Sequence, residues 1–270
     1  MECRALTTMK ELALVQELDM KIWGMDPVPL HQTSTAIKNG GLMLGMFDGE
    51  QLIGFSYSFA GMKEGKTYLC SHMLGIDPDY QSQGLGEIMK WKQREHAIDM
   101  GYDLMKWTYD PLETKNAKLN LSKLNGICDI YIENCYGNMT DKLNKGLPSD
   151  RFEIHWHLKS KHVAEKQSIA VEDAVMLNKI YINDENLPVF QALENIATDA
   201  DMYAMVVPKQ FQALKLIDHK LAFDWRLKTR EYFQKMFAKG FAVFHLEVQD
   251  DESIYYLVKK LRLQLEGEEE

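Results

Sequence analysis

Residues 75–86 read GIDPDYQSQGLG, and this stretch decides the fold of the first half of the chain. An apolar, strand-like run at residues 66–76 precedes it, Asp77 and Pro78 end that run, and a helix is predicted through about Met100. The start of a helix leaves backbone N–H groups unpaired and carries partial positive charge. Because glycine has no Cβ, a pyrophosphate could approach those groups closely. Tight packing of a strand on a helix also selects glycine, so the turn by itself leaves both explanations open.

The sequence on either side of the turn alternates between strand and helix patterns. Upstream, it predicts a strand at 3–6, helices at 8–23 and 30–38, and strands at 42–47 and 51–59 joined by an Asp48-Gly49 hairpin turn. Downstream, it predicts a strand at 102–109, a helix at 114–123, a strand at 127–136, a loop at 137–149 and a strand at 152–158.

A polar segment at residues 159–167 marks the predicted boundary between two domains, at 1–158 and 159–270. Beyond it the patterns predict strands at 174–182 and 202–207, helices at 209–221 and 224–239, and a hairpin of 241–248 with 254–258. The second domain is therefore expected to be α/β as well.

This order of elements, together with Gln81–Gly86, resembles the GNAT acetyltransferases, whose motif is Q/R-x-x-G-x-G/A. The resemblance covers roughly residues 1–158. It implies an α/β GNAT fold, a mixed central sheet flanked by helices, with an additional C-terminal α/β region. The segments WTYDPLETKNAKLN (107–120) and LPSDRF (147–152) resemble a prokaryotic GNAT subgroup that carries such an extension.

The resemblance also implies acetyl-CoA, or another acyl-CoA, as cosubstrate. The end of the strand before the turn would present free backbone groups to the pantetheine, and the turn itself would hold the pyrophosphate. A later helix led by an asparagine completes the pattern. The implied CoA-binding residues are Leu74, Gly75, Ile76, Gln81, Ser82, Gln83, Gly84, Leu85, Gly86 and Asn116.

The general base is less clearly marked. Many GNAT enzymes carry a glutamate before the glycine turn, and the corresponding position here is Cys70, which cannot serve as that base. His72 lies two residues further on, so it is expected on the same face of the strand. A neutral imidazole there could accept the acceptor's proton, although a half-buried structural histidine is the alternative.

Two further residues are candidates for the chemistry. The tyrosine that protonates the leaving thiolate in many family members falls at about Ser122, a weaker acid. Asp110, at the end of a predicted strand, could be a carboxylate in the acceptor cleft or simply the first residue of an Asp-Pro turn.

Arginines indicate the kind of acceptor. Arg151 follows the 137–149 loop, and its planar guanidinium would suit a carboxylate on a small metabolite. Asp150 could orient that guanidinium or bind the acceptor's ammonium group. Arg226 and Arg230 lie four apart on a predicted helix, a like-charge spacing that indicates either an anion or internal salt bridges.

Composition limits the other partners. The net charge of −9 argues against nucleic acid and anionic membrane surfaces as partners. The four cysteines form no CxxC pair and no zinc-like group with histidine, so no metal site is expected. No apolar run is long enough to cross a bilayer, and no signal peptide is recognised, so a cytoplasmic protein is expected. A homodimer is compatible with the sequence.

The sequence therefore leads to an acyl-CoA-dependent N-acyltransferase, acting by acetyl transfer to an amine of a small carboxylate-bearing metabolite. The alternative is a non-catalytic protein that binds acyl-CoA or a metabolite on the same scaffold, which the missing glutamate and tyrosine favour. Transfer to protein lysines is a third hypothesis, without a specific feature in its support.

Overall fold

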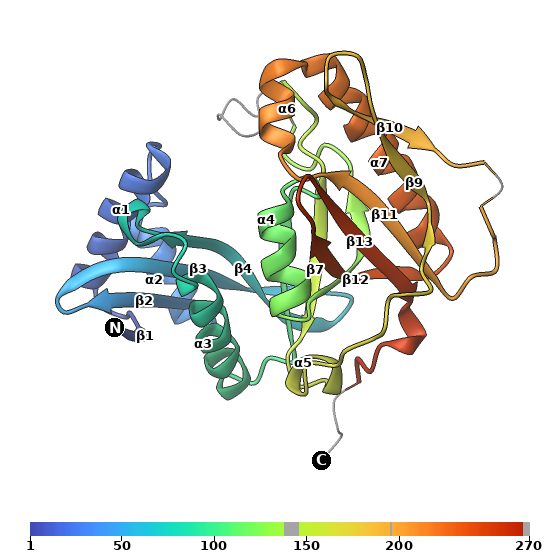
Figure 1. Ribbon diagram of the computed structural model, residues 1–270. Coiled ribbons are helices and arrows are strands. Elements are labelled where there is room, and N and C mark those ends of the chain that lie inside the picture. The colour runs from blue at the N-terminus through green and yellow to red at the C-terminus, as the bar shows by residue number, and fades with distance from the viewer. Residues whose placement is uncertain (138–145, 195, 267–270) are drawn as a thin grey trace. The chain divides into compact units, whose positions relative to one another are not determined.

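The computed structural model describes residues 1–137, 146–194 and 196–266, and it confirms the predicted α/β class: helices flank mixed, mainly antiparallel β-structure (Figure 1). Residues 138–145 of the predicted 137–149 loop lie outside the described residues. The chain forms two compact units, residues 1–107 with 157–159 and residues 108–156 with 160–270. These units are compact parts of the chain and do not test the domain boundary predicted between residues 158 and 159, which stays a prediction.

The strands of the first unit follow the predicted order, β1 (Glu2–Ala5), β2 (Leu42–Asp48), β3 (Gln51–Lys63), β4 (Lys66–Ile76) and β5 (Leu104–Tyr109). Strands β1 to β4 are antiparallel, and the Asp48-Gly49 turn joins β2 to β3 as predicted. Strand β5 instead runs parallel to β4 and pairs with it at Leu69–Met105 and Cys70–Lys106. This parallel pairing makes the β-structure of the first unit mixed.

Helices α1 (Met9–Trp23) and α2 (Leu30–Lys38) cover one face of these strands. Thr8 begins α1 through a capping box with Glu11, which satisfies backbone groups that the first turn would leave unpaired. Leu12, Val15 and Leu18 then pack against apolar side chains of β2 and β3. The first helix is therefore set by its cap and its apolar stripe, as the sequence predicted.

Helix α3 (Leu85–Asp99) follows the short 3₁₀ segment η1 (Pro78–Tyr80) and packs on β2, β3 and β4. The sequence pattern predicts one shared helix face for Leu85, Ile88, Met89, His96 and Met100, but this is wrong in part, because Ile88 is 49% and Met100 41% exposed. The residues of α3 that are buried are Leu85, Met89, Lys90, Gln93 and Ala97. Two polar residues thus occupy the inward face, where the apolar periodicity could not reveal them.

The second unit contains the remaining elements. They are α4 (Thr114–Ala117), a π-helical segment (Lys118–Lys123), β6 (Ile127–Ile132), β7 (Arg151–His157), α5 (Lys161–Ala164), β8 (Val175–Met176), β9 (Asn178–Ile182), β10 (Pro188–Ala192), β11 (Met202–Pro208), α6 (Phe211–Ile217), α7 (His219–Ala238), β12 (Phe241–Val248), β13 (Glu252–Lys259) and a closing 3₁₀ turn (Lys260–Arg262). The strand order is β7-β6-β12-β13-β11-β8, and β9 and β10 form a separate hairpin.

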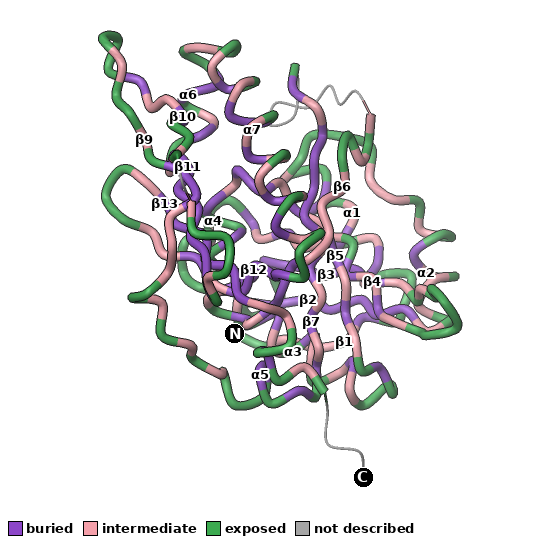
Figure 2. The backbone as a smooth tube through the Cα atoms, turned by 90° about the vertical axis from the view of Figure 1, so that its right-hand side faces the viewer, coloured by how far each residue is buried: buried purple, intermediate pink, exposed green. Residues whose placement is uncertain are grey.

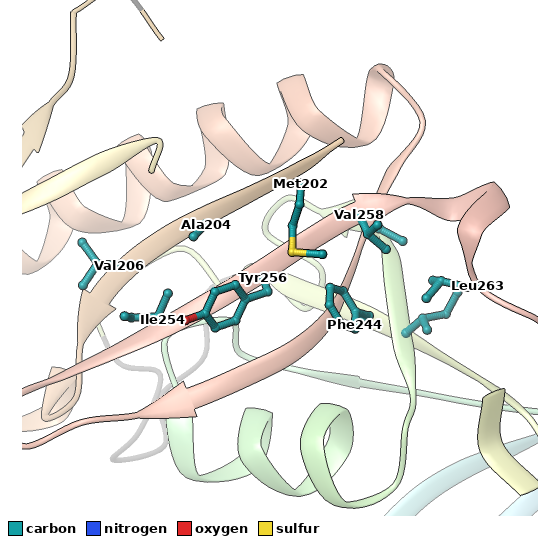
Figure 3. Packing of buried hydrophobic residues seen from close by; sticks show 10 residues of the cluster. Met202, Ala204, Val206, Phe244, Ile254, Tyr256, Val258 and Leu263 are labelled. Atoms are coloured by element: carbon teal, nitrogen blue, oxygen red, sulfur yellow. The ribbon is translucent and has the colours of Figure 1, made fainter. Parts of the chain in front are cut away.

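The core of this second unit lies on β11, β12 and β13, where buried residues follow one another along each strand (Figure 2). Met202, Phe244, Tyr256 and Val258 lie close together on one face of these three strands (Figure 3). The partly buried segment around β8 packs against the same cluster, which explains why so short a strand is held in place.

Two predicted boundaries in the second unit are wrong, and one strand was missed. The break between the two helices falls at Asp218, because its carboxylate caps α7 by accepting from the Leu221 N–H. Strand β6 ends at Ile132 instead of residue 136, and strand β10 was not predicted. None of the described helices is long and apolar enough to span a membrane.

Candidate functional site

The glycine turn adopts the conformation that an anion-binding helix start requires. Gly84 caps α3 with a φ of 77°, in the left-handed region that favours glycine. The first helical hydrogen bonds are those from the Glu87 and Ile88 N–H groups to the Gly84 carbonyl, so the amides just before Glu87 precede the ladder. A Cβ added at Gly84 would meet nothing within 4 Å. Tight packing therefore does not explain this glycine; its left-handed backbone does, and its open surroundings leave room for an anion.

Gly75 serves a different purpose. A Cβ there would come within 2.9 Å of Phe55 and Trp23 and within 2.8 Å of Ile22, so the absent side chain lets α1 approach β4. Its backbone pairs with Phe55, as Leu74 and Ile76 pair with Ser56 and Gly54 of β3.

The other edge of β4 changes partner along its length. Pairing with β5 extends only to Cys70, and beyond it the described strand pairs join β4 to β3 alone. The Ile76 carbonyl accepts a hydrogen bond from the Gln81 Nε2 at 3.4 Å. That the backbone of Leu74, Gly75 and Ile76 on the side away from β3 binds a ligand stays a prediction.

An ion pair fixes the segment between β4 and the turn. The Asp77 carboxylate, only 2% exposed, accepts from the Lys21 Nζ at 2.7 and 2.8 Å and caps the next turn by accepting from the Asp79 N–H. The hydrogen bond from Lys21 holds the pKa of Asp77 below its usual range. Helix α1 therefore anchors the start of the glycine turn.

His72 occupies a β-bulge. Tyr57 pairs with Met73 and the next residue, Ser58, pairs with Ser71, so His72 has no partner in β3. A bulge inserts one residue and redirects the side chains around it, and bulges are frequent next to active sites. Here it places His72 and Met73 beside side chains of the α1–α2 face, while Ser71 faces α3.

The imidazole of His72 lines an open hollow of about 490 Å³, hereafter the His72 hollow. Its lining residues are Val28, His31, Gln32, Thr35, Ala36, Tyr57, Phe59 and His72. The ring centroids of Tyr57 and Phe59 lie 6.0 and 5.6 Å from that of His72. His72 is exposed to solvent, yet desolvation by the groups around it lowers its pKa, so its neutral form, the form that can accept a proton, dominates at neutral pH.

Asp110 lies in the second unit and is engaged on both oxygens. Its Oδ1 accepts from the Leu112 N–H at 2.8 Å, the contact of an Asp-Pro turn, and its Oδ2 pairs with the Arg226 guanidinium at 2.5 Å. The Arg151 Nη1 lies 3.8 Å from the same Oδ2. Asp110 is thus both a turn residue and the centre of a buried charge cluster.

Arg151 is 7% exposed, and its Nη1 donates to the Asp150 carbonyl at 2.8 Å. Its guanidinium lies over the ring of Tyr136, 5.3 Å from the centroid. Burial and pairing with Asp110 are what an internal structural role predicts for Arg151.

The carboxylate of Asp150 is fully buried and saturated. It accepts from Arg230 at 2.9 Å on each oxygen, from the Tyr131 hydroxyl at 2.7 Å and from the Asn134 N–H at 3.0 Å. Arg226 and Arg230 thus form internal salt bridges, the alternative that the acidic composition favoured. Asp150 reaches Arg151 through its backbone carbonyl and not through its carboxylate.

The last two predicted residues also lie in the second unit. The Ser122 hydroxyl donates to the Leu246 carbonyl at 2.6 Å and accepts from the Leu246 N–H at 3.2 Å, so it ties the π-helical segment to β12. Asn116 is exposed on α4. The glycine turn, β4 and His72 belong to the first unit, and Asp110, Asn116, Ser122, Asp150 and Arg151 belong to the second.

Sequence reasoning missed the bulge and the His72 hollow, because neither leaves a periodic signal. It also assigned no role to Lys90 and Gln93 of α3, which are buried. No group of three or more His, Cys, Asp or Glu side chains could hold a metal ion within residues 1–137, 146–194 and 196–266.

No protein-family model and no curated protein matches the chain. Among solved structures, the chain is similar to the ribosomal-protein-S18-alanine N-acetyltransferase of Escherichia coli, at 14% identity over 64% of this chain and 97% of that one, with a TM-score of 0.48. A putative acetyltransferase of Salmonella typhimurium with its cofactor acetyl-CoA matches at 13% identity over 58% and 93%, with a TM-score of 0.46. A GNAT-family acetyltransferase of Streptococcus pneumoniae matches at 14% identity over 57% and 98%, with a TM-score of 0.45. At these identities and scores the likeness assigns no residue role and no substrate.

Proposed function

We propose that the chain is an acyl-CoA-dependent N-acyltransferase that transfers an acetyl group to the amine of a small, carboxylate-bearing metabolite. The observation that carries the proposal is the left-handed, unobstructed Gly84 at the start of α3, placed after a strand whose far edge is unpaired beyond Cys70. A pyrophosphate suits the first feature and an extended amide chain such as pantetheine suits the second.

The proposed reaction is direct aminolysis of the thioester. The neutral amine attacks the acyl carbon, a C–N bond forms, the C–S bond breaks, and CoA leaves as a thiolate. His72 accepts the proton that the amine nitrogen loses, since desolvation by the groups around it keeps its imidazole neutral. A thiolate is a good leaving group, so the step needs little protonation of the leaving sulfur by an acid such as Ser122. Positioning of the two reactants supplies much of the rate enhancement.

The acceptor's carboxylate is assigned to Arg151, whose guanidinium offers a planar pair of donors. The Asp150 carbonyl, 2.8 Å from Nη1, orients that guanidinium. The Asp110 Oδ2 lies 2.5 Å from the Arg226 Nη2 and 3.8 Å from the Arg151 Nη1, so the ion pair with Arg226 is the closer one.

Thiol release measures this function directly. The protein is incubated with acetyl-CoA and a panel of small amines, and free CoA is followed with a thiol reagent while the acylated product is identified by mass. Transfer predicts amine-dependent thiol release with a matching N-acetyl product. Slow release that does not depend on the amine would contradict the proposal.

One observation favours a second candidate, a binding protein without turnover. The Ser122 hydroxyl is engaged by the Leu246 backbone as both donor and acceptor, and Cys70 stands where a glutamate base is expected. A binding protein predicts that acetyl-CoA raises the melting temperature while no amine in the panel releases thiol.

A further inference from the structure

Lys90 is a lysine in the interior of the first unit. It is 3% exposed, and within the described residues its ammonium group has no carboxylate partner. Its Nζ instead donates to the Ser71 Oγ at 2.8 Å and to the Gln93 Oε1 at 3.1 Å, and it lies 3.6 Å from the centroid of the Trp107 ring. Burial lowers the pKa of Lys90 to about 7. An apolar side chain would occupy such a place at lower cost in free energy, so the polar contacts call for an explanation.

Gln93 lies one turn further along α3 and completes the same network. Its Nε2 donates to Ser56 and Ser58 of β3 at 2.6 Å each, and its Oε1 accepts from the Ser71 hydroxyl of β4 at 3.1 Å. Ser58 and Ser71 face each other in the sheet and form the first pair beside the bulge. Gln93 therefore forms hydrogen bonds to both strands at the bulge, and Lys90 donates to Ser71 on the β4 side.

The placement of this network is specific. Ser71 directly precedes His72, the residue that the bulge leaves without a partner in β3. Gly84 also caps the start of helix α3, so one rigid element carries the glycine turn at its start and the contacts to the bulge about two turns later. A hydrogen-bonded side chain in a buried site has few alternative rotamers, and such a group fixes the geometry of its neighbours.

We propose that Lys90 and Gln93 are positioning residues that clamp the β4 bulge and so fix the His72 imidazole relative to the glycine turn at the start of α3. This inference rests on the proposed function for its catalytic meaning. Its structural content, the dependence of the His72 conformation on Lys90, is independent of that function.

The test uses Lys90→Met in the full-length chain, because methionine keeps the unbranched stem and removes the amine. Lys92→Met is the matched control, since Lys92 lies on the same helix and forms an exposed pair with Glu95. Both variants are checked for folding by thermal unfolding. The first readout is the NMR signal of the His72 imidazole, assigned by its loss in His72→Ala. The second is kcat, measured beside KM for acetyl-CoA.

The clamp predicts that Lys90→Met shifts the His72 imidazole signals and lowers kcat about tenfold or more, with KM for acetyl-CoA within about threefold of the parent. Lys92→Met should change neither. Ser71→Ala should reproduce the Lys90→Met effect, and Ser71→Thr, which keeps the hydroxyl, should restore most of the activity.

A folded Lys90→Met protein with unchanged His72 signals overturns the clamp. If Lys90→Met does not fold, the Ser71→Ala and Ser71→Thr pair decides by the same two readouts. If the parent shows no acyl transfer, the proposed function fails, and the His72 signals alone decide whether the clamp exists.

Discussion

The Arg230 guanidinium makes two hydrogen bonds of 2.9 Å to the carboxylate of Asp150, one to each oxygen. The side chain of Asp150 is 0% exposed and that of Arg230 18%, so the pair joins α7 to the start of β7 with little solvent between. Because Asp150 directly precedes Arg151, this ion pair fixes the backbone next to Arg151.

Arg230→Met should destabilise the protein strongly. Removing one partner leaves the Asp150 carboxylate buried without its main counter-charge, which costs about 3–5 kcal/mol in comparable buried pairs. Chemical denaturation measures the loss. Lys235→Met is the control, because Lys235 pairs with Glu231 on the exposed face of the same helix, where a pair contributes about 0.3–0.5 kcal/mol. Equal effects of the two substitutions would contradict a structural role for the Asp150–Arg230 pair.

Acetyl-CoA should raise the melting temperature of the parent, and Gly84→Asp should abolish that rise. The substitution adds a side chain and a negative charge at the helix start where the pyrophosphate is expected. Gly101→Asp controls for backbone strain, since Gly101 has a φ of 88°, equally open surroundings and a place beyond the other end of α3. It should keep the response to acetyl-CoA. A Gly84→Asp protein that binds acetyl-CoA like the parent would show that the turn is not the CoA site.

His72→Ala should lower kcat/KM and remove the acid limb of its pH profile. Desolvation by the groups around it lowers the pKa of His72, so the imidazole is neutral above a pH that lies below the reference value of about 6.5. Activity should therefore rise through that lower pH and level off near neutrality. His31→Ala is the matched control, because it removes the other imidazole of the His72 hollow. An acid limb that persists in His72→Ala would assign the base elsewhere, with Asp110 or a water chain as the next candidates.

Acceptors that bear a carboxylate should outperform their neutral amides by about tenfold or more in kcat/KM. A hydrogen bond between charged groups contributes about 1.5–3 kcal/mol, and Arg151 would form two of them. Arg151→Lys keeps the charge and loses the planar fork, so much of the preference should disappear. A purely structural Arg151 gives the opposite pattern in the same assay, with a lower melting temperature and an unchanged ranking of acceptors.

Acid should destabilise the fold through His162. Its ring is fully buried, its Nδ1 lies 3.0 Å from the Gln167 Oε1, and burial lowers its pKa. The unfolded chain then binds the proton more readily, so stability falls as the pH drops below about 6.5, the unfolded value, by at most about 1.4 kcal/mol per pH unit. His162→Gln should flatten the stability profile between pH 6.5 and 5, whereas replacing the exposed His31 should not. Denaturation midpoints at several pH values provide the measurement.

The sequence predicted the conformation of the glycine turn because that conformation is local. A left-handed glycine, a helix start and the strand before it are set by residues within one short stretch, and the structure places Gly84 and α3 accordingly. The Asp48-Gly49 hairpin and the capped start of α1 were predicted for the same reason. The apolar stripe of α7 through Trp225, Thr229 and Phe233 is buried as its period indicated.

Tertiary structure alone decided the surroundings of His72. A bulge depends on the register between two strands, and no spacing within β4 shows that Tyr57 and Ser58 skip one residue of their partner. Lys90 and Gln93 have no place in the apolar pattern of the helix, yet Ser56, Ser58 and Ser71 lie beneath α3 and supply hydrogen-bond partners that offset the cost of burying them. The partners of Arg226 and Arg230 were hidden for the same reason, since Asp110 and Asp150 come from segments about eighty or more residues away. Local backbone chemistry can be read from neighbouring residues, but the partner of a buried polar group is fixed only when distant strands and helices come together.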